Sequence, residues 1–196
     1  MNSGPPNPRI VVFARWPEPG KVKTRLASAL GPEGAAAVYR RLLAHTIDVA
    51  RSSGLPFELR ITGAAPERFA GEFGADIVVT EQGEGNLGAR MARVQTPVLI
   101  VGSDLPALSP DLLREAANAL TSREIVLGPA RDGGYWLIGQ RKPCPWLFTE
   151  MAWSTPQVLP ETLARCRQRG IEPALLPELA DVDEPGDLAD WPEFAP

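Results

Sequence analysis

The alternation of short apolar runs with segments of helical periodicity is the feature of this sequence that most restricts its fold. The runs at 9–14 (RIVVFA) and 97–102 (PVLIVG) are rich in β-branched residues and almost wholly apolar, which is typical of strands buried on both faces. Between them, the segment 31–54 places apolar residues from Val38 to Val49 at helical spacing. Strands that alternate with helices predict an α/β fold of three layers, with a mostly parallel central sheet covered by helices on both faces.

The same two patterns divide nearly the whole chain. We expect strands at residues 9–14, 57–62, 75–80, 97–102 and 124–130. We expect helices at residues 31–54, 66–73, 86–94, 109–120 and 154–170, with Asn86 placed to act as an N-cap. A chain of 196 residues with 44% hydrophobic content suits one core, so residues 9–196 are expected to form a single domain after a disordered segment at 1–8.

Composition excludes several classes of protein. The net charge of −4 argues against nucleic acid as the default partner. No apolar run reaches the roughly 18 residues of a membrane span, and the N-terminal residues lack the apolar stretch of a secretory signal, so we expect a cytoplasmic protein. Cys144 and Cys166 match no metal or disulfide spacing and are expected to be free thiols. The only histidine, His45, falls on an apolar helical stripe, and no G-x-S-x-G motif supports a serine hydrolase.

Asp104 is the first candidate for chemistry, in the stretch VGSDLPAL (101–108). It follows the apolar run 97–102, and ligands of open α/β sheets bind outside the carboxyl ends of the strands. A carboxylate at this place would therefore reach a ligand crevice. An Asp followed by Leu and Pro is also ordinary turn chemistry, and the residue pattern leaves both interpretations open.

A cationic loop follows the first expected strand, in FARWPEPGKVKTRLA (13–27). Two prolines stiffen it, and Lys21, Lys23 and Arg25 alternate along it. Lysine as a mobile point charge and arginine as a bidentate fork suit phosphoryl oxygens. The loop is not a Walker motif, because Gly20-Lys21 is followed by valine in place of Ser or Thr, so a solvated basic loop stays the alternative.

Two further segments could contribute to a site. In GPARDGGYWLIG (128–139), Asp132 and two glycines form either a hairpin turn or a place where a ligand approaches the backbone beside Tyr135. The acidic segment 179–191 is expected to be a solvated turn that leads into a helix at Pro185. Asp181 and Asp183 precede that helix and could meet Asp104. Two or three carboxylates with substrate phosphates form the usual site for Mg²⁺ or Mn²⁺.

Taken together and in order, these motifs resemble a bacterial glycosyltransferase-A-like family that was first catalogued as a domain of unknown function, in the nucleotide-diphospho-sugar transferase superfamily. The motifs are FARWPEPGKVKTRLA, EQGEGNLGARM, VGSDLPAL, GPARDGGYWLIG, MAWST and DVDEPGDL, and they span about residues 9 to 191. The resemblance implies a Rossmann-like glycosyltransferase-A fold. It also implies a metal-dependent transferase that acts on a nucleotide-activated donor.

The resemblance implies roles for individual residues. Asp104 would bind Mg²⁺ or Mn²⁺ together with Asp183, for which Asp181 is the rival. Lys21, Lys23 and Arg25 would hold the diphosphate; Lys23 and Arg25 would offset charge during transfer, and Asp132 would act as a general base for the acceptor. The nucleotide side would further comprise Arg15, Gln82, Gly85, Asn86 and Ser103, although the family usually has Asp in place of Asn86. The sugar or acceptor side would comprise Gly133, Gly134, Tyr135, Trp153 and Ser154.

Three functions fit these roles. In a nucleotide-diphospho-sugar glycosyltransferase, which we favour at this point, a nucleoside diphosphate leaves C1 of a sugar. In a nucleotidyltransferase, a phosphorylated acceptor attacks an α-phosphate and pyrophosphate leaves. A non-catalytic nucleotide-binding protein is the third. The partners are a nucleotide sugar or nucleoside triphosphate and a small-molecule acceptor of unknown identity. Trp16, Trp146 and Trp153 would form either an acceptor platform or the contact of a homodimer.

Overall fold

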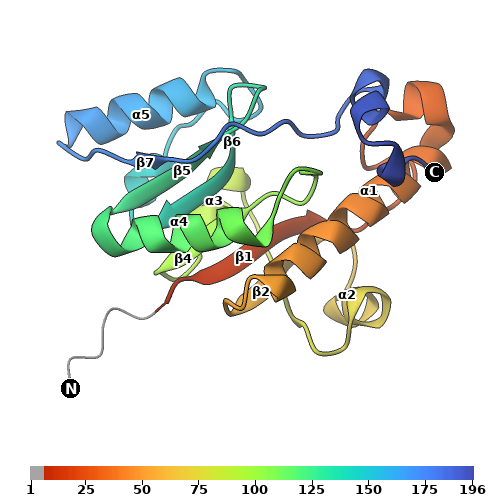
Figure 1. The fold of residues 1–196 in the computed structure, drawn as a ribbon, viewed down its shortest axis with the longest axis horizontal. Helices are drawn as coiled ribbons and strands as arrows, with labels where there is room; N and C mark the ends of the chain where they lie inside the picture. Colours follow the sequence, from red (N-terminus) through yellow and green to blue (C-terminus); the bar gives the residue numbers. More distant parts are fainter. Residues whose placement is uncertain (1–6) are drawn as a thin grey trace.

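The computed structural model describes residues 7–196, and a seven-stranded sheet forms its centre (Figure 1). The strands are β1 (Arg9–Arg15), β2 (Phe57–Thr62), β3 (Val78–Glu81), β4 (Val98–Val101), β5 (Ile125–Pro129), β6 (Tyr135–Gln140) and β7 (Ala174–Leu175). Their order is β3-β2-β1-β4-β6-β5-β7, and only β6 runs antiparallel to its neighbours. The expectation of a mostly parallel sheet is confirmed.

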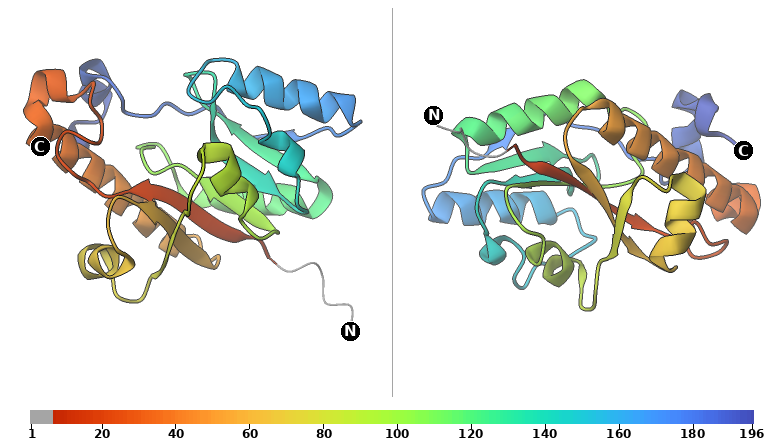
Figure 2. Two further views of the ribbon diagram at one scale, coloured as in Figure 1. Left: turned by 180° about the vertical axis from the view of Figure 1, so that it is seen from behind. Right: turned by 90° about the horizontal axis from the view of Figure 1, so that it is seen from below.

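Helices cover both faces of this sheet, so the domain has three layers (Figure 2). On one face lie α1 (Ala27–Ser52), α2 (Pro66–Phe73) and α4 (Pro110–Ser122), and on the other lie α3 (Leu87–Ala92) and α5 (Val158–Gln168). Strand β1 shows why a continuous apolar run suits such a sheet. Its alternate residues Ile10 and Val12 enter the core beneath α1, whereas Val11 and Phe13 enter the core beneath α3 and α5.

The C-terminal segment packs against the first half of α1. It contains two short 3₁₀ helices, η2 (Pro185–Asp190) and η3 (Pro192–Phe194), and a third, η1 (Pro145–Leu147), lies earlier in the chain. Val182, Leu188 and Phe194 form a small apolar cluster with Leu26 and Leu42. This cluster ties the acidic tail to the loop that follows β1.

Most expected elements are present, and the differences have local causes. The expected strand 57–62 and helix 66–73 agree with β2 and α2, and segment 128–139 is the β5–β6 hairpin. Helix α5 begins at Val158 and not at 154, because Ser154 has a φ of 62° and the segment before Val158 is a turn. The helix expected at Pro185 is 3₁₀ and not α-helical. The two-residue strand β7 was not expected.

The structure also bears on the expectations for the histidine, the two cysteines and the ends of the domain. His45 is a core-edge residue, as expected: its Nε2 lies 3.2 Å from the Leu108 carbonyl, and its ring packs against Phe194. Cys144 and Cys166 are free and buried. Of the segment expected to be disordered, residues 1–6 lie outside the described residues; the single domain expected for 9–196 stays a prediction. Within residues 7–196, no helix is both long and apolar enough to cross a membrane.

Gly128 in β5 has no room for a side chain, because a Cβ there would lie 2.3 Å from ring atom Cε2 of Trp136. The Trp136 ring is buried, and its Nε1 donates a hydrogen bond to the Pro177 carbonyl at 3.1 Å. We expect Gly128→Ala to lower the free energy of unfolding by about 1–3 kcal/mol in urea denaturation, as overpacking does. The control Gly71→Ala, in α2 with nothing within 4 Å of its added methyl, should not destabilise the protein. Equal losses in both variants would contradict the prediction.

Candidate functional site

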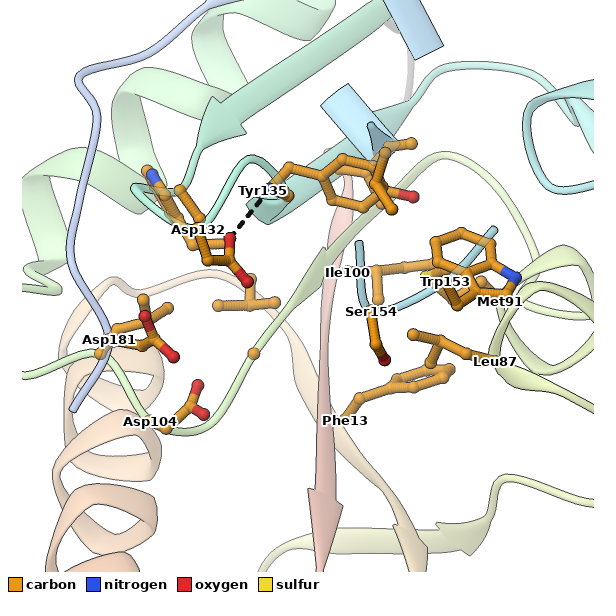
Figure 3. A pocket seen from close by; sticks show the side chains of 18 of the residues that line it. Phe13, Leu87, Met91, Ile100, Asp104, Asp132, Tyr135, Trp153, Ser154 and Asp181 are labelled. Carbon is orange, nitrogen blue, oxygen red and sulfur yellow. Dashed lines mark hydrogen bonds between the residues drawn. The ribbon is translucent and has the colours of Figure 1, made fainter. Parts of the chain in front are cut away.

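A cavity of about 270 Å³ opens at the carboxyl ends of β1 and β4 and beside the β5–β6 hairpin (Figure 3). One end of it carries the carboxylates of Asp104, Asp132 and Asp181, which Figure 3 shows on the same side of the cavity. The other end is apolar. The cavity therefore lies where ligands of α/β sheets are expected, and Asp104 is on its wall, as the sequence predicted.

The tail carboxylates reach this place because the backbone of the tail pairs with the loop after β4. The amide of Val182 donates a hydrogen bond to the Asp104 carbonyl at 3.2 Å, and the Val182 side chain is fully buried. Since Val182 points into the core, Asp181 and Asp183 on either side of it project elsewhere. Asp181 lines the cavity, whereas Asp183 does not.

Lys23 lies between two of these carboxylates. Its Nζ is 2.7 Å from Oδ2 of Asp104 and 3.7 Å from Oδ1 of Asp183, and only 6% of its side chain is exposed. Burial by itself lowers the pKa of Lys23, but the hydrogen bond and charge of Asp104, with the charges of Asp183 and Asp181, outweigh burial and raise it. Lys23 is therefore protonated. It is a buried cation within an acidic cluster that consists of Asp104, Asp181 and Asp183.

Arg25 and Lys21, the other cations of the loop, are placed differently. Arg25 Nη1 lies 2.7 Å from Oδ2 of Asp183, and 68% of the Arg25 side chain is exposed, so its guanidinium can reorient towards a ligand. Lys21 pairs with Glu18 on the surface, at 2.9 Å. Of the three cations expected at the site from the sequence, Lys23 and Arg25 contact the acidic cluster, whereas Lys21 does not.

The arrangement of the carboxylates decides which of them fit a divalent cation. Within residues 7–196, no group of three or more His, Cys, Asp or Glu side chains is arranged to hold a metal. Asp104 and Asp181 both line the cavity, and burial together with the charge of Asp104 raises the pKa of Asp181. Mg²⁺ commonly takes only one or two carboxylates and completes its ligands with phosphates and water. Asp104 and Asp181 fit that pattern better than Asp183, which is bound to Arg25.

Asp181→Asn should stabilise the metal-free protein at neutral pH. The folded protein raises the pKa of Asp181 above its ordinary value of 3.8, mainly through burial, so its ionisation opposes folding. This cost is absent below pH 3.8, appears as the pH rises above that value, and is complete above the raised pKa. Urea unfolding should show the variant more stable than wild type at pH 7 but not below pH 3.8. The exposed control Asp190→Asn should show no such pattern, and an Asp181→Asn gain that persists at low pH would contradict the prediction.

Several residues expected on the nucleotide side instead support the framework. Nε2 of Gln82 donates to the carbonyls of Ala14 and Arg60, at 3.1 and 3.0 Å, and Oε1 accepts from Arg90, so both amide hydrogens of this buried side chain are already used. The hydroxyl of Ser103 is buried and pairs with that of Tyr39 at 2.8 Å. The side chains of Gln82 and Ser103 are thus held by other groups of the protein, and ligand contact of these two residues stays a prediction.

The remaining expected residues of that side lie at the surface. Asn86 is the N-cap of α3, and its Oδ1 accepts a hydrogen bond from the Ala89 amide at 2.9 Å. Gly85 precedes it with a φ of 94°, a conformation that favours glycine. Arg15 is exposed at the end of β1. Ligand contact of these three residues stays a prediction.

The hairpin residues divide between turn and cavity. Oδ1 of Asp132 accepts a hydrogen bond from the Gly134 amide at 2.8 Å, which leaves the other carboxylate oxygen towards the cavity. Gly133 has no room for a side chain, because a Cβ there would lie 2.5 Å from the carbonyl oxygen of Pro156. Gly134 lines the cavity. The turn expected for this segment is therefore present, and the approach of a ligand to its backbone stays a prediction.

Aromatic and apolar side chains complete the cavity. The rings of Tyr135 and Trp153 meet edge to face with centroids 6.4 Å apart, and Ser154 lies beside them on the wall. These three residues were expected from the sequence. The apolar residues that share the wall were not, chiefly Phe13, Leu87, Met91, Ile100 and Ile138. Phe13 could have been found, because it alternates in β1 with residues of the opposite face.

The three tryptophans do not form one surface. Trp16 is buried against Phe69. The ring of Trp146 is covered by the Arg169 guanidinium, whose Cζ lies 4.2 Å from the ring centroid. Only Trp153 lines the cavity. The three residues therefore form no common platform, whereas an acceptor platform at Trp153 and a tryptophan contact in a homodimer stay predictions.

The chain matches one protein family and is similar to several solved structures. The family described as "uncharacterized protein conserved in bacteria (DUF2064)" matches residues 45–155. A crystal structure named as a candidate nucleotide-diphospho-sugar transferase from Desulfovibrio desulfuricans G20 is 34% identical with a TM-score of 0.80, over 90% of this chain and 82% of that one. Rv0371c from Mycobacterium tuberculosis, in complex with manganese, has a TM-score of 0.55 at 22% identity, over 96% and 99% of the chains. The expected nucleotide-diphospho-sugar transferase fold is confirmed.

Two curated proteins are similar in sequence. The 2-phospho-L-lactate guanylyltransferase of Methanopyrus kandleri is 37% identical over 94 residues, which cover 46% of this chain and 47% of that protein. The protein of the same name from Archaeoglobus fulgidus is 29% identical over 125 residues, 61% of this chain and 54% of that one. The chain thus spans about half the length of the curated relatives it matches.

Proposed function

The chain belongs to the bacterial DUF2064 family, and from the names of its relatives and the geometry of the cavity we propose that it is a metal-dependent transferase acting on a nucleotide donor. The observation that supports this most directly is the set of charges at one end of the cavity. Asp104 and Asp181 face the cavity, and Lys23 lies 2.7 Å from Asp104. Carboxylates for a divalent cation, next to a buried lysine, suit the phosphates of a nucleotide.

We propose nucleotidyl transfer as the reaction. An oxygen of an acceptor phosphate forms a bond to the α-phosphorus of a nucleoside triphosphate. The bond from that phosphorus to the bridging oxygen breaks, and pyrophosphate leaves with the electron pair. The curated relatives support this reaction, since both are guanylyltransferases by name. Glycosyl transfer, which the sequence alone favoured, becomes the second candidate.

The side chains have separate tasks in this proposal. Asp104 and Asp181 would hold Mg²⁺ or Mn²⁺, which when bound neutralises charge on the donor phosphates. Lys23 would donate hydrogen bonds to a phosphate oxygen in exchange for its contact with Asp104. Arg25, with its exposed guanidinium, would approach the leaving pyrophosphate. Both cations offset the negative charge that grows on the leaving group.

Product analysis tests the proposal. The purified protein is incubated with each nucleoside triphosphate, MgCl₂ and a set of phosphorylated small molecules, and pyrophosphate is measured by a coupled phosphate assay. Pyrophosphate that appears only with both acceptor and metal, together with a nucleotidylated acceptor in the mass spectrum, is the expected result. Absence of metal-dependent nucleotide binding in a thermal-shift assay would contradict the proposal.

Glycosyl transfer is favoured by the relative from D. desulfuricans, which is similar over 90% of this chain and is named as a candidate nucleotide-diphospho-sugar transferase. Incubation with nucleotide sugars separates the two candidates. Release of a nucleoside diphosphate that depends on an acceptor hydroxyl would favour glycosyl transfer. Release of pyrophosphate from a triphosphate would favour nucleotidyl transfer.

Asp132→Asn provides a second distinction between the two reactions. An acceptor phosphate is already a nucleophile and needs no general base, so in nucleotidyl transfer we expect the variant to keep its activity within about tenfold. An acceptor hydroxyl must lose a proton, so in glycosyl transfer the loss of this carboxylate should cost about 100-fold or more in kcat. Steady-state kinetics on the substrate found above measures the difference. The amide oxygen of Asn can still accept from the Gly134 amide, so the turn should be preserved.

A further inference from the structure

The charged residues of the cavity wall all have the same sign. Of its lining residues within 7–196, Asp104, Asp132 and Asp181 are charged, and none is Lys, Arg or His. The nearby cations Lys23 and Arg25 lie at the carboxylate end of the cavity. Lys23 is paired with Asp104, and Arg25 is paired with Asp183. None of the lining side chains can therefore neutralise an anionic group of a ligand, whereas Lys23, Arg25 and a metal can do so at that end.

Away from the carboxylates, the wall is mainly apolar and aromatic, and its polar residues there, such as Ser154, are uncharged. Figure 3 shows Phe13, Leu87, Met91 and Ile100 around the end of the cavity that Trp153 also lines. Small-molecule sites of this kind bury an apolar body and use a few polar groups to orient it. A charged group at this end would lose its water without gaining an oppositely charged side chain of the lining.

Like Ser154 and the indole Nε1 of Trp153, Tyr135 adds a neutral polar group to this end of the cavity. Its hydroxyl is buried and has no hydrogen-bond partner among the described residues. Burial raises the pKa of Tyr135, so the hydroxyl remains protonated and uncharged. Tyr135 therefore adds no charge to this end of the cavity.

We infer that the acceptor of this protein is a phosphate monoester whose organic part is uncharged and largely apolar. This inference rests on the proposed nucleotidyl transfer and adds the chemistry of the acceptor to it. The acceptor phosphate would lie at the Asp104 end and attack the α-phosphorus, with pyrophosphate as the leaving group. The acceptor would then differ from 2-phospho-L-lactate, the compound in the names of the curated relatives, whose carboxylate would meet Asp132 or the apolar wall.

A matched pair of compounds tests the inference. Isopropyl phosphate has a methyl group where 2-phospho-L-lactate has its carboxylate, and phenyl phosphate extends the apolar part. Binding of each to the full chain with MgCl₂ is measured by isothermal titration calorimetry, and their use as acceptors is measured by pyrophosphate release. We expect isopropyl phosphate to bind at least about tenfold more tightly than 2-phospho-L-lactate, because like charges oppose the carboxylate. Equal or tighter binding of 2-phospho-L-lactate would overturn the inference.

A pair of variants tests whether the preference for isopropyl phosphate over 2-phospho-L-lactate arises in this cavity. Leu87 lines it and is 42% exposed, so Leu87→Lys adds a cation at the apolar end with little risk to folding. This variant should lose most of the preference for isopropyl phosphate. Val78→Lys, at a residue of β3 that is 57% exposed and is not part of the cavity lining, should keep it. The same preference in both variants would overturn the inference.

Nucleotide binding separates failure of this inference from failure of the proposed function. If a triphosphate with Mg²⁺ raises the melting temperature and yields pyrophosphate, but 2-phospho-L-lactate is the preferred acceptor, the proposed function stands and the inference is overturned. If no triphosphate binds and no acceptor yields pyrophosphate, both are overturned.

Discussion

Asp104→Asn is expected to lower kcat by about 100- to 1000-fold, the cost of removing a group that stabilises charge in a transition state. Asp104 lines the cavity beside Asp181, and its Oδ2 also binds Nζ of Lys23 at 2.7 Å. One substitution therefore removes a proposed metal ligand and the partner that positions Lys23. The asparagine side chain has nearly the same shape, so the loop after β4 should keep its conformation.

Titration of the variant with MnCl₂, in the presence of a nucleoside triphosphate, measures the loss of metal affinity directly. Asp190→Asn is the matched control, because it removes the same charge from an exposed residue of η2. Thermal unfolding of both variants shows whether the fold is intact. Unchanged Mn²⁺ affinity in Asp104→Asn would rule out Asp104 as a metal ligand.

Lys23→Gln is expected to lower kcat by about 100-fold and to weaken binding of the nucleoside triphosphate. The Lys23 ammonium lies 2.7 Å from Asp104 and 3.7 Å from Asp183 and is almost fully buried, so no water-exposed cation can easily replace it. Its backbone has a φ of 45°, and the buried side chain of Val22 anchors the loop next to it. The lysine is thus held in position before any ligand arrives.

Lys21→Gln is the control for this prediction, since Lys21 belongs to the same loop but is 56% exposed and pairs only with Glu18. A change of less than about threefold is expected there, as for most surface ion pairs. Kinetics at several triphosphate concentrations separates an effect on kcat from one on KM. Similar losses in both variants would show that the loop acts through its total charge, and Lys23 would then have no separate role.

The periodic elements could be predicted from the sequence because their causes are local. Strand β2 and helix α2 were expected with the bounds that the structure has, since alternation and helical spacing are read within a few residues. The N-caps Asn86 and Ser109 follow from the same local chemistry. Strand β7 has two residues, and only pairing with β5 makes it a strand.

The site was predicted less completely, because side-chain roles depend on neighbours that are far apart in the chain. Gln82 looked available for a nucleotide, but the carbonyls of Ala14 and Arg60 bind its amide. The apolar wall was missed because a leucine or methionine in the sequence gives no sign of whether it faces a core or a cavity.

The sequence by itself determined the alternating α/β architecture, the acidic residue after β4 and the cationic loop after β1, since each follows from residue types within one short segment. Only the tertiary structure decided which of these groups meet. The hydrogen bond from the Val182 amide to the Asp104 carbonyl brings residues that are far apart in the chain together, directs Asp181 into the cavity and leaves Asp183 to Arg25. Packing of the tail on α1 holds that contact in place, and no local pattern specifies such packing.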